Sequence, residues 1–293
     1  MTAVNILHNI KWVRPRVTLT LVAHLDETGS GPRPKSVMLT FLGIHLLGRP
    51  AAIYSGSVID VFAGVGVSEE AVRSTLTRMA GTGLLTRHRH GRKVYFGLSD
   101  RLAAVLEDGR RRIWETGAVN RSPDSGWTLV GFSLPDTRRG DRHDLRRQLT
   151  WAGFGLLQNG LWVAPGVRDV TAIVEQLGLD GHVTVFTAQP AKPTEAASLV
   201  GKAFDTATIA SRYHDFLEKW DAGKPSFPDD LTRQLVLHSD WLHVVRRDPH
   251  LPAEHLPRDW PAIQAETLFR KLDEDLREGS TALAAERLEL LPI

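Results

Sequence analysis

The chain has 293 residues, 42% of them hydrophobic and 24% charged, which suits a globular protein of two or three domains. It contains no cysteine, so a disulfide framework, a thiolate zinc site and a cysteine nucleophile are excluded, and a reducing cytoplasm is the expected location. The most apolar helix-length run, residues 37–48, is too short to span a bilayer, and we expect no membrane partner.

The net charge of +2 conceals an asymmetry along the chain. Residues 1–117 hold 16 Lys and Arg against 9 Asp and Glu, whereas residues 118–293 hold 20 against 25. A basic front part favours a polyanionic partner for that part, although chance clustering on a solvated surface gives the same counts.

The front of the chain is expected to contain three helices. Residues 1–33 are a leader of uncertain structure, either a simple tail or an extra basic arm. The basic residues of such an arm are Lys11, Arg14 and Arg16. Apolar periodicity then predicts a buried helix from Ser36 to about residue 48 and a short second helix through residues 58–62.

The third helix is the best defined of the three. Ser68 is a typical N-cap, and the acidic pair that follows it suits the positive end of a helix dipole. Val72, Leu76 and Met79 form an i, i+4, i+7 stripe that predicts the buried face. Glycines at 81 and 83 are expected to end the helix.

A strongly basic hairpin is predicted directly after the third helix. Residues 84–89 and 92–98 are β-prone, and His90-Gly91 is a plausible two-residue turn between them. A further helix is expected from about Ser99 to Trp114. The order of three helices, a hairpin and a helix is that of a winged helix-turn-helix, in which a basic wing lies along a phosphate backbone.

Two groups of residues are therefore expected to bind DNA. The exposed face of the third helix offers groups for base edges and phosphates, namely Arg73, Ser74, Thr77 and Arg78. The hairpin offers Arg87, Arg89, Arg92, Lys93 and the hydroxyl of Tyr95, which alternation places outward, opposite Val94, Phe96 and Leu98. An ordinary amphipathic helix with a solvated polar face, and a surface tyrosine, are the alternative interpretations.

The remainder of the chain predicts two more domains. Strand and helix signals alternate as βαββαβ over residues 126–190, with Asn159-Gly160 as a hairpin turn, which is the order of a ferredoxin-like domain. Residues 198–293 are expected to be helical. Together with a winged-helix domain at 34–117, these give an α+β multidomain protein.

Little in the sequence suggests metal or cofactor chemistry. His88 and His90 alternate on one predicted strand, but their neighbours are arginines rather than further ligands. Asp136, at the end of a predicted strand, is either a helix-capping residue or a Mg²⁺ ligand beside a scissile phosphate. We expect no cofactor, no structural metal and no enzymatic activity.

The segment GVSEEAVRSTLTRMAGTGLLTRHRHGRKVYFGLSD resembles the N-terminal domain of the PaaX family of phenylacetic-acid-pathway transcriptional regulators, which are mostly repressors. The resemblance continues through WTLVGFSLPDTRRGDRHDLRRQLTWAGFGLLQNGLWVAPG and LPAEHLPRDWPAIQAETLFRKL, so it covers about residues 34–280. It implies a winged helix, a central domain similar to CRISPR spacer-acquisition nucleases, and a helical C-terminal domain. The leader departs from the family pattern.

The resemblance also implies partners. These are double-stranded operator DNA, a second copy of the chain in a homodimer, and an aryl- or acyl-coenzyme A thioester, such as phenylacetyl-CoA, that releases the operator. Candidate effector-binding residues are Arg212, Trp241, Arg246 and Arg247, for which surface ion pairs and a core tryptophan are the alternatives. Two rival functions are a metal-dependent nuclease that uses Asp136 and a nonspecific nucleoid-binding protein.

Overall fold

The computed structural model describes residues 34–115, 117–120, 126–221 and 226–293. The predictions for the leader, including its basic arm, lie outside these residues. The described chain forms two compact units, and each is treated by itself. The central unit contains residues 126–204, and the split unit contains residues 34–120 and 205–293, so the central unit interrupts the split unit in sequence. The described residues contain ten α-helices and two four-stranded antiparallel sheets.

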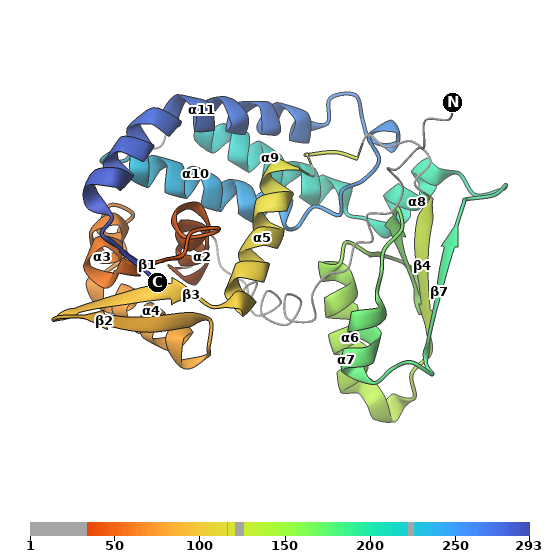
Figure 1. Cartoon of the computed structure of the whole chain (residues 1–293). Coiled ribbons are helices and arrows are strands. Elements are labelled where there is room, and N and C mark those ends of the chain that lie inside the picture. The colour runs from red at the N-terminus through yellow and green to blue at the C-terminus, as the bar shows by residue number, and fades with distance from the viewer. Residues whose placement is uncertain (1–33, 116, 121–125, 222–225) are drawn as a thin grey trace, which may run out of the picture. The chain divides into compact units, whose positions relative to one another are not determined.

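The split unit begins with helices around a short strand (Figure 1). Its first elements are α2 (Pro34–His45), β1 (Ala51–Tyr54), α3 (Ser55–Ala63), α4 (Glu69–Gly81), β2 (Leu85–His90), β3 (Lys93–Leu98) and α5 (Asp100–Trp114). Strand β1 is an element that apolar periodicity did not predict. The cap expected at the third helix is confirmed, because Ser68 Oγ accepts a hydrogen bond from the Ala71 amide.

The basic hairpin has its turn one residue later than expected. His90 pairs with Lys93, so the two loop residues are Gly91 and Arg92 rather than His90 and Gly91. The physical reason is that Gly91 has a φ of +59°, a left-handed conformation that glycine adopts without the steric cost borne by histidine.

A strand from the far end of the chain completes this sheet. Strand β8 (Leu290–Pro292) pairs with the outer side of β1, which gives the order β2-β3-β1-β8. The C-terminal end of the chain consequently lies beside β1 (Figure 1).

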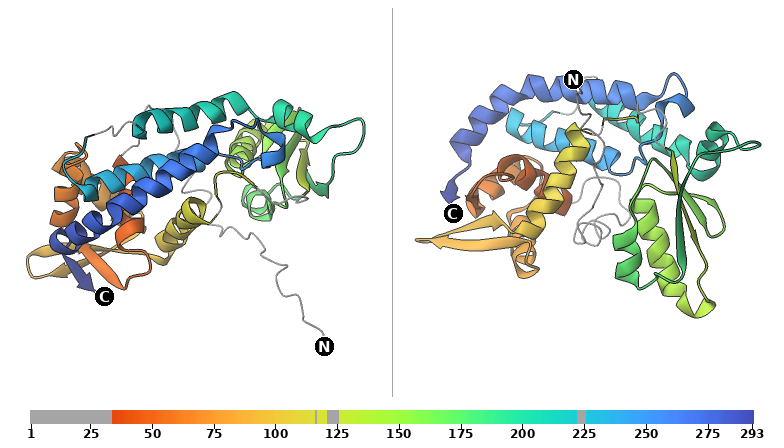
Figure 2. Two further views of the ribbon diagram at one scale, coloured as in Figure 1. Left: turned by 90° about the horizontal axis from the view of Figure 1, so that it is seen from above. Right: turned by 45° about the vertical axis from the view of Figure 1, so that its right-hand side comes forward.

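The second half of the split unit is helical, with α9 (Thr206–Trp220), α10 (Asp230–Val245) and α11 (Pro261–Arg287). Helices α10 and α11 lie side by side in both views of Figure 2. Between them the Trp241 and Phe269 rings stack with centroids 5.0 Å apart. Helix α10 also contacts α2 and α5, so these helices complete the core beneath the first half of the unit.

The central unit has one sheet covered by helices. Its elements are β4 (Trp127–Phe132), a 3-10 turn (Asp136–Arg138), α6 (Arg139–Trp151), β5 (Gly155–Gln158), β6 (Leu161–Pro165), α7 (Thr171–Leu177), β7 (Val183–Ala188) and α8 (Ala196–Ala203). The sheet order is β5-β6-β4-β7, and α6 and α7 lie together on one face (Figure 1). Leu145, Leu149, Trp162 and Ile173 are among the side chains buried between helices and sheet.

Strand β7 forms an edge of this sheet. It pairs with β4 along its whole length, and Figure 1 shows its other side without a neighbouring strand. The Phe186 side chain on this strand is 60% exposed, and Val185 is 43% exposed. An edge strand with exposed large apolar residues is a surface suited to pairing or packing with another chain.

Candidate nucleic-acid interface

The exposed face of α4 brings together all four residues predicted on it. Arg73, Ser74, Thr77 and Arg78 line one shallow hollow with Glu69 and Glu70. The opposite face is seated on the core, where Val72, Leu76 and Met79 are at most 2% exposed. This division between an apolar face and a hydrogen-bonding face is what a helix that enters a DNA groove requires.

Arg73 has an intrahelical partner on this face. Its guanidinium lies 2.6 Å from Glu69 Oε1, one turn earlier, and both side chains are about 60% exposed, at 62% and 59%. Exposed i,i+4 pairs of this kind contribute roughly 0.3–0.5 kcal/mol. The pair therefore orients Arg73 without preventing it from exchanging Glu69 for another hydrogen-bonding group.

The cations of the hairpin are exposed but divided between its two faces. Arg87 pairs with Phe96 across the strands, and Arg89 pairs with Val94, so both arginines share the face of the core side chains. Lys93 pairs with His90 and lies on the opposite face with Tyr95. Arg92 occupies the loop. The five predicted residues therefore do not form a single stripe.

Tyr95 lies on the outer face, as alternation predicts, but its hydroxyl already has a partner within the protein. The residue is only 4% exposed. Its hydroxyl donates a hydrogen bond to the Glu289 carboxylate, and its ring packs against Tyr54 with centroids 5.6 Å apart. The Glu289 contact, with burial, raises the pKa of Tyr95. Both contacts come from elements that were not predicted, β1 and the segment after α11.

Lys93 is held by the same carboxylate. Its Nζ lies 2.6 Å from Glu289 Oε2 and 4.9 Å from the centroid of the Tyr54 ring. Glu289 is the residue that sequence reasoning missed at this site. Nothing local marks it, because its partners precede it by almost 200 residues, 196 for Lys93.

The possible metal ligands do not gather into a site. His88 Nε2 lies 2.8 Å from the Thr86 hydroxyl, on the outer face of the hairpin. Asp136 is 84% exposed at the start of the 3-10 turn, with Arg142 3.7 Å away. Within the described ranges, no three His, Asp or Glu side chains are arranged as a metal centre.

The candidate effector residues lie on the helices of the split unit or at their ends. Trp241 is 1% exposed and stacks on Phe269, so in this structure it is a core residue. Arg247 Nη1 lies 3.1 Å from His243 Nε2, and Arg246 caps the C-terminus of α10. Arg212 contributes electrostatically to the buried Tyr213–Asp248 pair.

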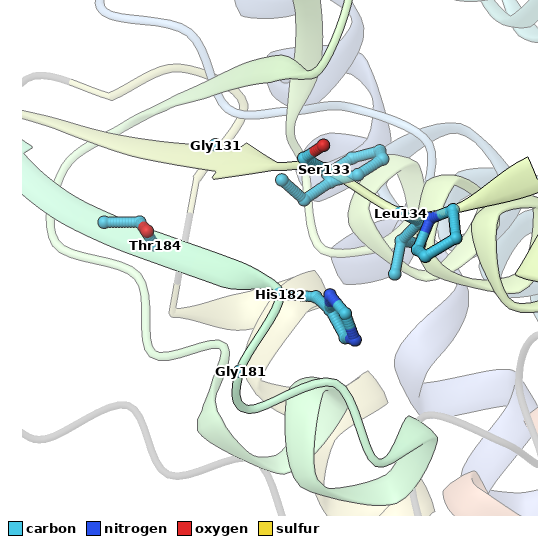
Figure 3. Close-up of a pocket in the computed structure, with 8 residues that line it drawn as sticks. Gly131, Ser133, Leu134, Gly181, His182 and Thr184 are labelled. Carbon is cyan, nitrogen blue, oxygen red and sulfur yellow. The ribbon is translucent and has the colours of Figure 1, made fainter.

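One further hollow occurs in the central unit, at the end of β4 and the start of β7 (Figure 3). Ser133, His182 and Thr184 supply its polar groups, and Leu134 is among its apolar ones. None of the residues predicted to carry function lines it. Its polar groups come from the ends of two strands that are remote in sequence, so no sequence motif marks it.

None of the helices in the described part of the chain combines the length and apolar character needed to cross a membrane.

Comparison with protein families gives three consecutive matches. Residues 33–102 match the model of PaaX-like proteins, residues 120–200 match the PaaX protein central Cas2-like domain, and residues 204–286 match the PaaX-like protein C-terminal domain. The transcriptional repressor PaaX of Escherichia coli is 27% identical over 271 residues, which cover 87% of this chain and 84% of the relative.

A solved structure has a similar fold. The uncharacterized protein Rv0674 from Mycobacterium tuberculosis is 26% identical, with a TM-score of 0.60 over 84% of this chain and 96% of that one.

Proposed function

Because the chain belongs to the PaaX family, we propose that it is a sequence-specific DNA-binding transcriptional repressor rather than an enzyme. Homology to a repressor over most of the chain supports DNA-binding repression as the general role. The observation that carries the specific proposal is the exposed face of α4, where two arginines, a serine and a threonine lie above a buried apolar stripe.

In this proposal the first half of the split unit is a winged helix-turn-helix. Helix α4 is the recognition helix, and Arg73 or Arg78 reads a guanine while Ser74 and Thr77 contact bases or phosphates. The β2–β3 hairpin is the wing, and its exposed cations Arg87, Arg89, Arg92 and Lys93 contact the flanking backbone. Tyr95 takes part only if Glu289 releases its hydroxyl.

We further propose a homodimer that reads a pseudo-palindromic operator with half-sites one or two turns apart, ~34 Å per turn. The β7 edge, with Phe186 and Val185 exposed, supports a self-association surface in the central unit. The order β5-β6-β4-β7 with two helices on one face supports the ferredoxin-like assignment for residues 126–190. Residues 34–117 and 198–293 remain the proposed winged-helix and helical domains.

The proposed effector is an aryl- or acyl-CoA thioester such as phenylacetyl-CoA, in the cytoplasm. Arg212, Arg246 and Arg247 are the proposed partners of its phosphates, and Trp241 is the proposed aromatic partner, which requires its core ring to become accessible. Release of DNA follows only if the thioester binds the DNA-free state more tightly than the DNA-bound state.

Fluorescence anisotropy on DNA from upstream of the protein's own gene, compared with a scrambled duplex, tests this function. We expect at least ~10³-fold preference for the former, and release by one member of a panel of CoA thioesters. Arg73→Ala should lose ~1–3 kcal/mol on the specific duplex only. Arg258→Ala, which removes one exposed cation from the connection before α11, is the control and should leave this preference intact.

The same experiment separates the rivals. Equal affinity for both duplexes with steep salt dependence would favour a nucleoid-binding protein. Cleavage of DNA in Mg²⁺ or Mn²⁺ that is abolished by Asp136→Ala would favour the nuclease. If Arg73→Ala bound the specific duplex as tightly as the wild type, the placement of the recognition helix on α4 would be wrong.

A further inference from the structure

The segment that follows α11 places an acid on the outer face of the basic hairpin. Glu289 is fixed through its main chain on both sides. Its carbonyl oxygen accepts a hydrogen bond from the Tyr54 amide at 2.9 Å, and its own amide donates to Ser57 Oγ at 3.0 Å. Pairing of β8 with β1 begins at the next residue, where Leu290 pairs with Ile53. The position of the Glu289 side chain is therefore set by the sheet.

From this position the carboxylate contacts two groups of β3 at once. One oxygen accepts the Tyr95 hydroxyl, and the other lies 2.6 Å from Lys93 Nζ. Lys93 and Tyr95 lower the pKa of Glu289, and Glu289 raises the pKa of Lys93, so both partners of the ion pair stay charged near neutral pH. The side chains of Lys93 and Glu289 are 47% and 43% exposed, so solvent and an approaching anion can reach the pair.

The pair also determines which way Lys93 points. The Glu289 carboxylate and the Tyr54 ring hold its ammonium on the outer face, opposite Arg87 and Arg89. Lys93 adjoins the loop residue Arg92, and its long flexible side chain can reach past the end of the hairpin once released. A DNA phosphate and Glu289 cannot both take the same ammonium as their close partner without bringing two anions together.

We propose that Glu289 competes with DNA phosphates for Lys93, so that the segment after α11 limits the strength with which the hairpin binds DNA. This inference rests on the proposed DNA-binding function. It assigns the residue a restraining role that acts on every DNA sequence alike, because phosphate contacts carry no sequence information.

Glu289→Gln tests the competition directly. Glutamine keeps an oxygen acceptor for Tyr95 and leaves both main-chain hydrogen bonds in place, but it removes the negative charge. We expect roughly two- to fivefold tighter binding to both the upstream and the scrambled duplex, the range set by exposed ion pairs. The plot of log affinity against log salt should steepen by up to about 0.9, equivalent to one added phosphate contact.

Two controls identify the source of the gain. Glu286→Gln changes the net charge equally from an exposed position three residues earlier, and it should give a smaller gain than Glu289→Gln. In a Lys93→Ala background, Glu289→Gln should give no more gain than Glu286→Gln, because the contested ammonium is absent. Thermal unfolding of each variant checks that the sheet is intact.

The outcomes separate this inference from the function on which it rests. If the wild type binds DNA and Glu289→Gln binds equally or more weakly, the inference fails while the proposed function stands. An equal gain from Glu286→Gln, or an undiminished gain from Glu289→Gln without Lys93, would also overturn it. If the wild type binds neither duplex, both fail.

Discussion

The two sheets of this protein are similar in size but differ in how the chain supplies them. The central unit takes its four strands from one contiguous segment, and the side chains clustered between its helices and sheet are predominantly apolar. The split unit takes three strands from residues 51–98 and the fourth from residues 290–292. Its helices bury a polar contact between His238 and Asp273, in which Nε2 and Oδ1 are 2.6 Å apart. The unit that carries the proposed DNA-binding surface thus depends on long-range polar contacts.

Removal of the Asp273 carboxylate should cause the largest difference in stability between the two units. Asp273 is 3% exposed, and its carboxylate accepts hydrogen bonds from Gln234 and Arg277 and lies 2.6 Å from His238 Nε2. Asp273→Ala leaves the His238 ring and the Gln234 amide without their buried acceptor, and we expect ~3–5 kcal/mol of destabilisation confined to the split unit. Amide hydrogen exchange, followed separately for the residues of each unit, checks this prediction. Glu274→Ala, at an exposed position beside it, should change stability by less than about 0.5 kcal/mol.

Acid should weaken the same unit through His45. This residue is 6% exposed, and burial, assisted by the charges of Arg49 and His238, lowers its pKa to about 4. Because the folded pKa lies below the unfolded value of ~6.5, the contribution is complete above pH ~6.5 and declines as the pH falls towards 4. The full loss is ~3 kcal/mol.

Chemical denaturation of His45→Phe between pH 7 and 4 measures this contribution. The variant keeps a ring beside Phe41, whose centroid lies 4.7 Å from that of His45, and it should lose part of the pH dependence seen in the wild type. His143→Phe, at an exposed position in α6, should retain all of it. Identical pH profiles for the wild type and His45→Phe would contradict the assignment.

Gly155→Ala should have the opposite selectivity, because it should destabilise the central unit and not the split unit. A Cβ at this position would lie 2.3 Å from the Ala203 carbonyl oxygen and 2.8 Å from the Phe204 ring, where β5 meets the end of α8. Overpacking of this kind costs ~1–3 kcal/mol. Gly140→Ala in α6, where a Cβ meets nothing within 4 Å, should be neutral or stabilising. Calorimetry of the pair distinguishes a steric effect from a general glycine effect.

The smallest loss of stability should come from removing the N-cap of α4, which is a purely local interaction. Ser68→Ala removes the side-chain cap of α4 and should cost ~1 kcal/mol, seen as faster exchange of the first amides of that helix. Ser74→Ala, in the exposed middle of the same helix, is the matched control and should leave those amides protected. Equal exchange in both variants would mean that tertiary packing, not the cap, fixes where α4 begins.

These cases also explain which elements the sequence could predict. Helix α4 has its cap, its apolar stripe and its terminal glycines within sixteen residues, and the β5–β6 turn is marked by Asn159-Gly160. Strands β1 and β8 have four and three residues, too few for a recognisable alternation. Each is stabilised by a partner from the other end of the chain, which composition and periodicity do not reveal.

The candidate site divides in the same way. The residues of α4 were predictable because one amphipathic helix determines both its buried and its exposed face. The basic residues of the hairpin were predictable from the sequence. The burial of Tyr95 and the ion pair between Lys93 and Glu289 were not. Both depend on Glu289, whose approach is a property of the complete sheet rather than of any nearby sequence.

The hydrogen bond between Ser57 and Glu289 joins residues 232 positions apart, and this separation has a consequence for synthesis. At typical translation rates, about 10 to 50 s pass between the appearance of the two residues. During that interval β1 is an open edge in the nascent chain, available to chaperones or to other β-strands. The central unit, made from one uninterrupted segment, can meanwhile fold on the ribosome.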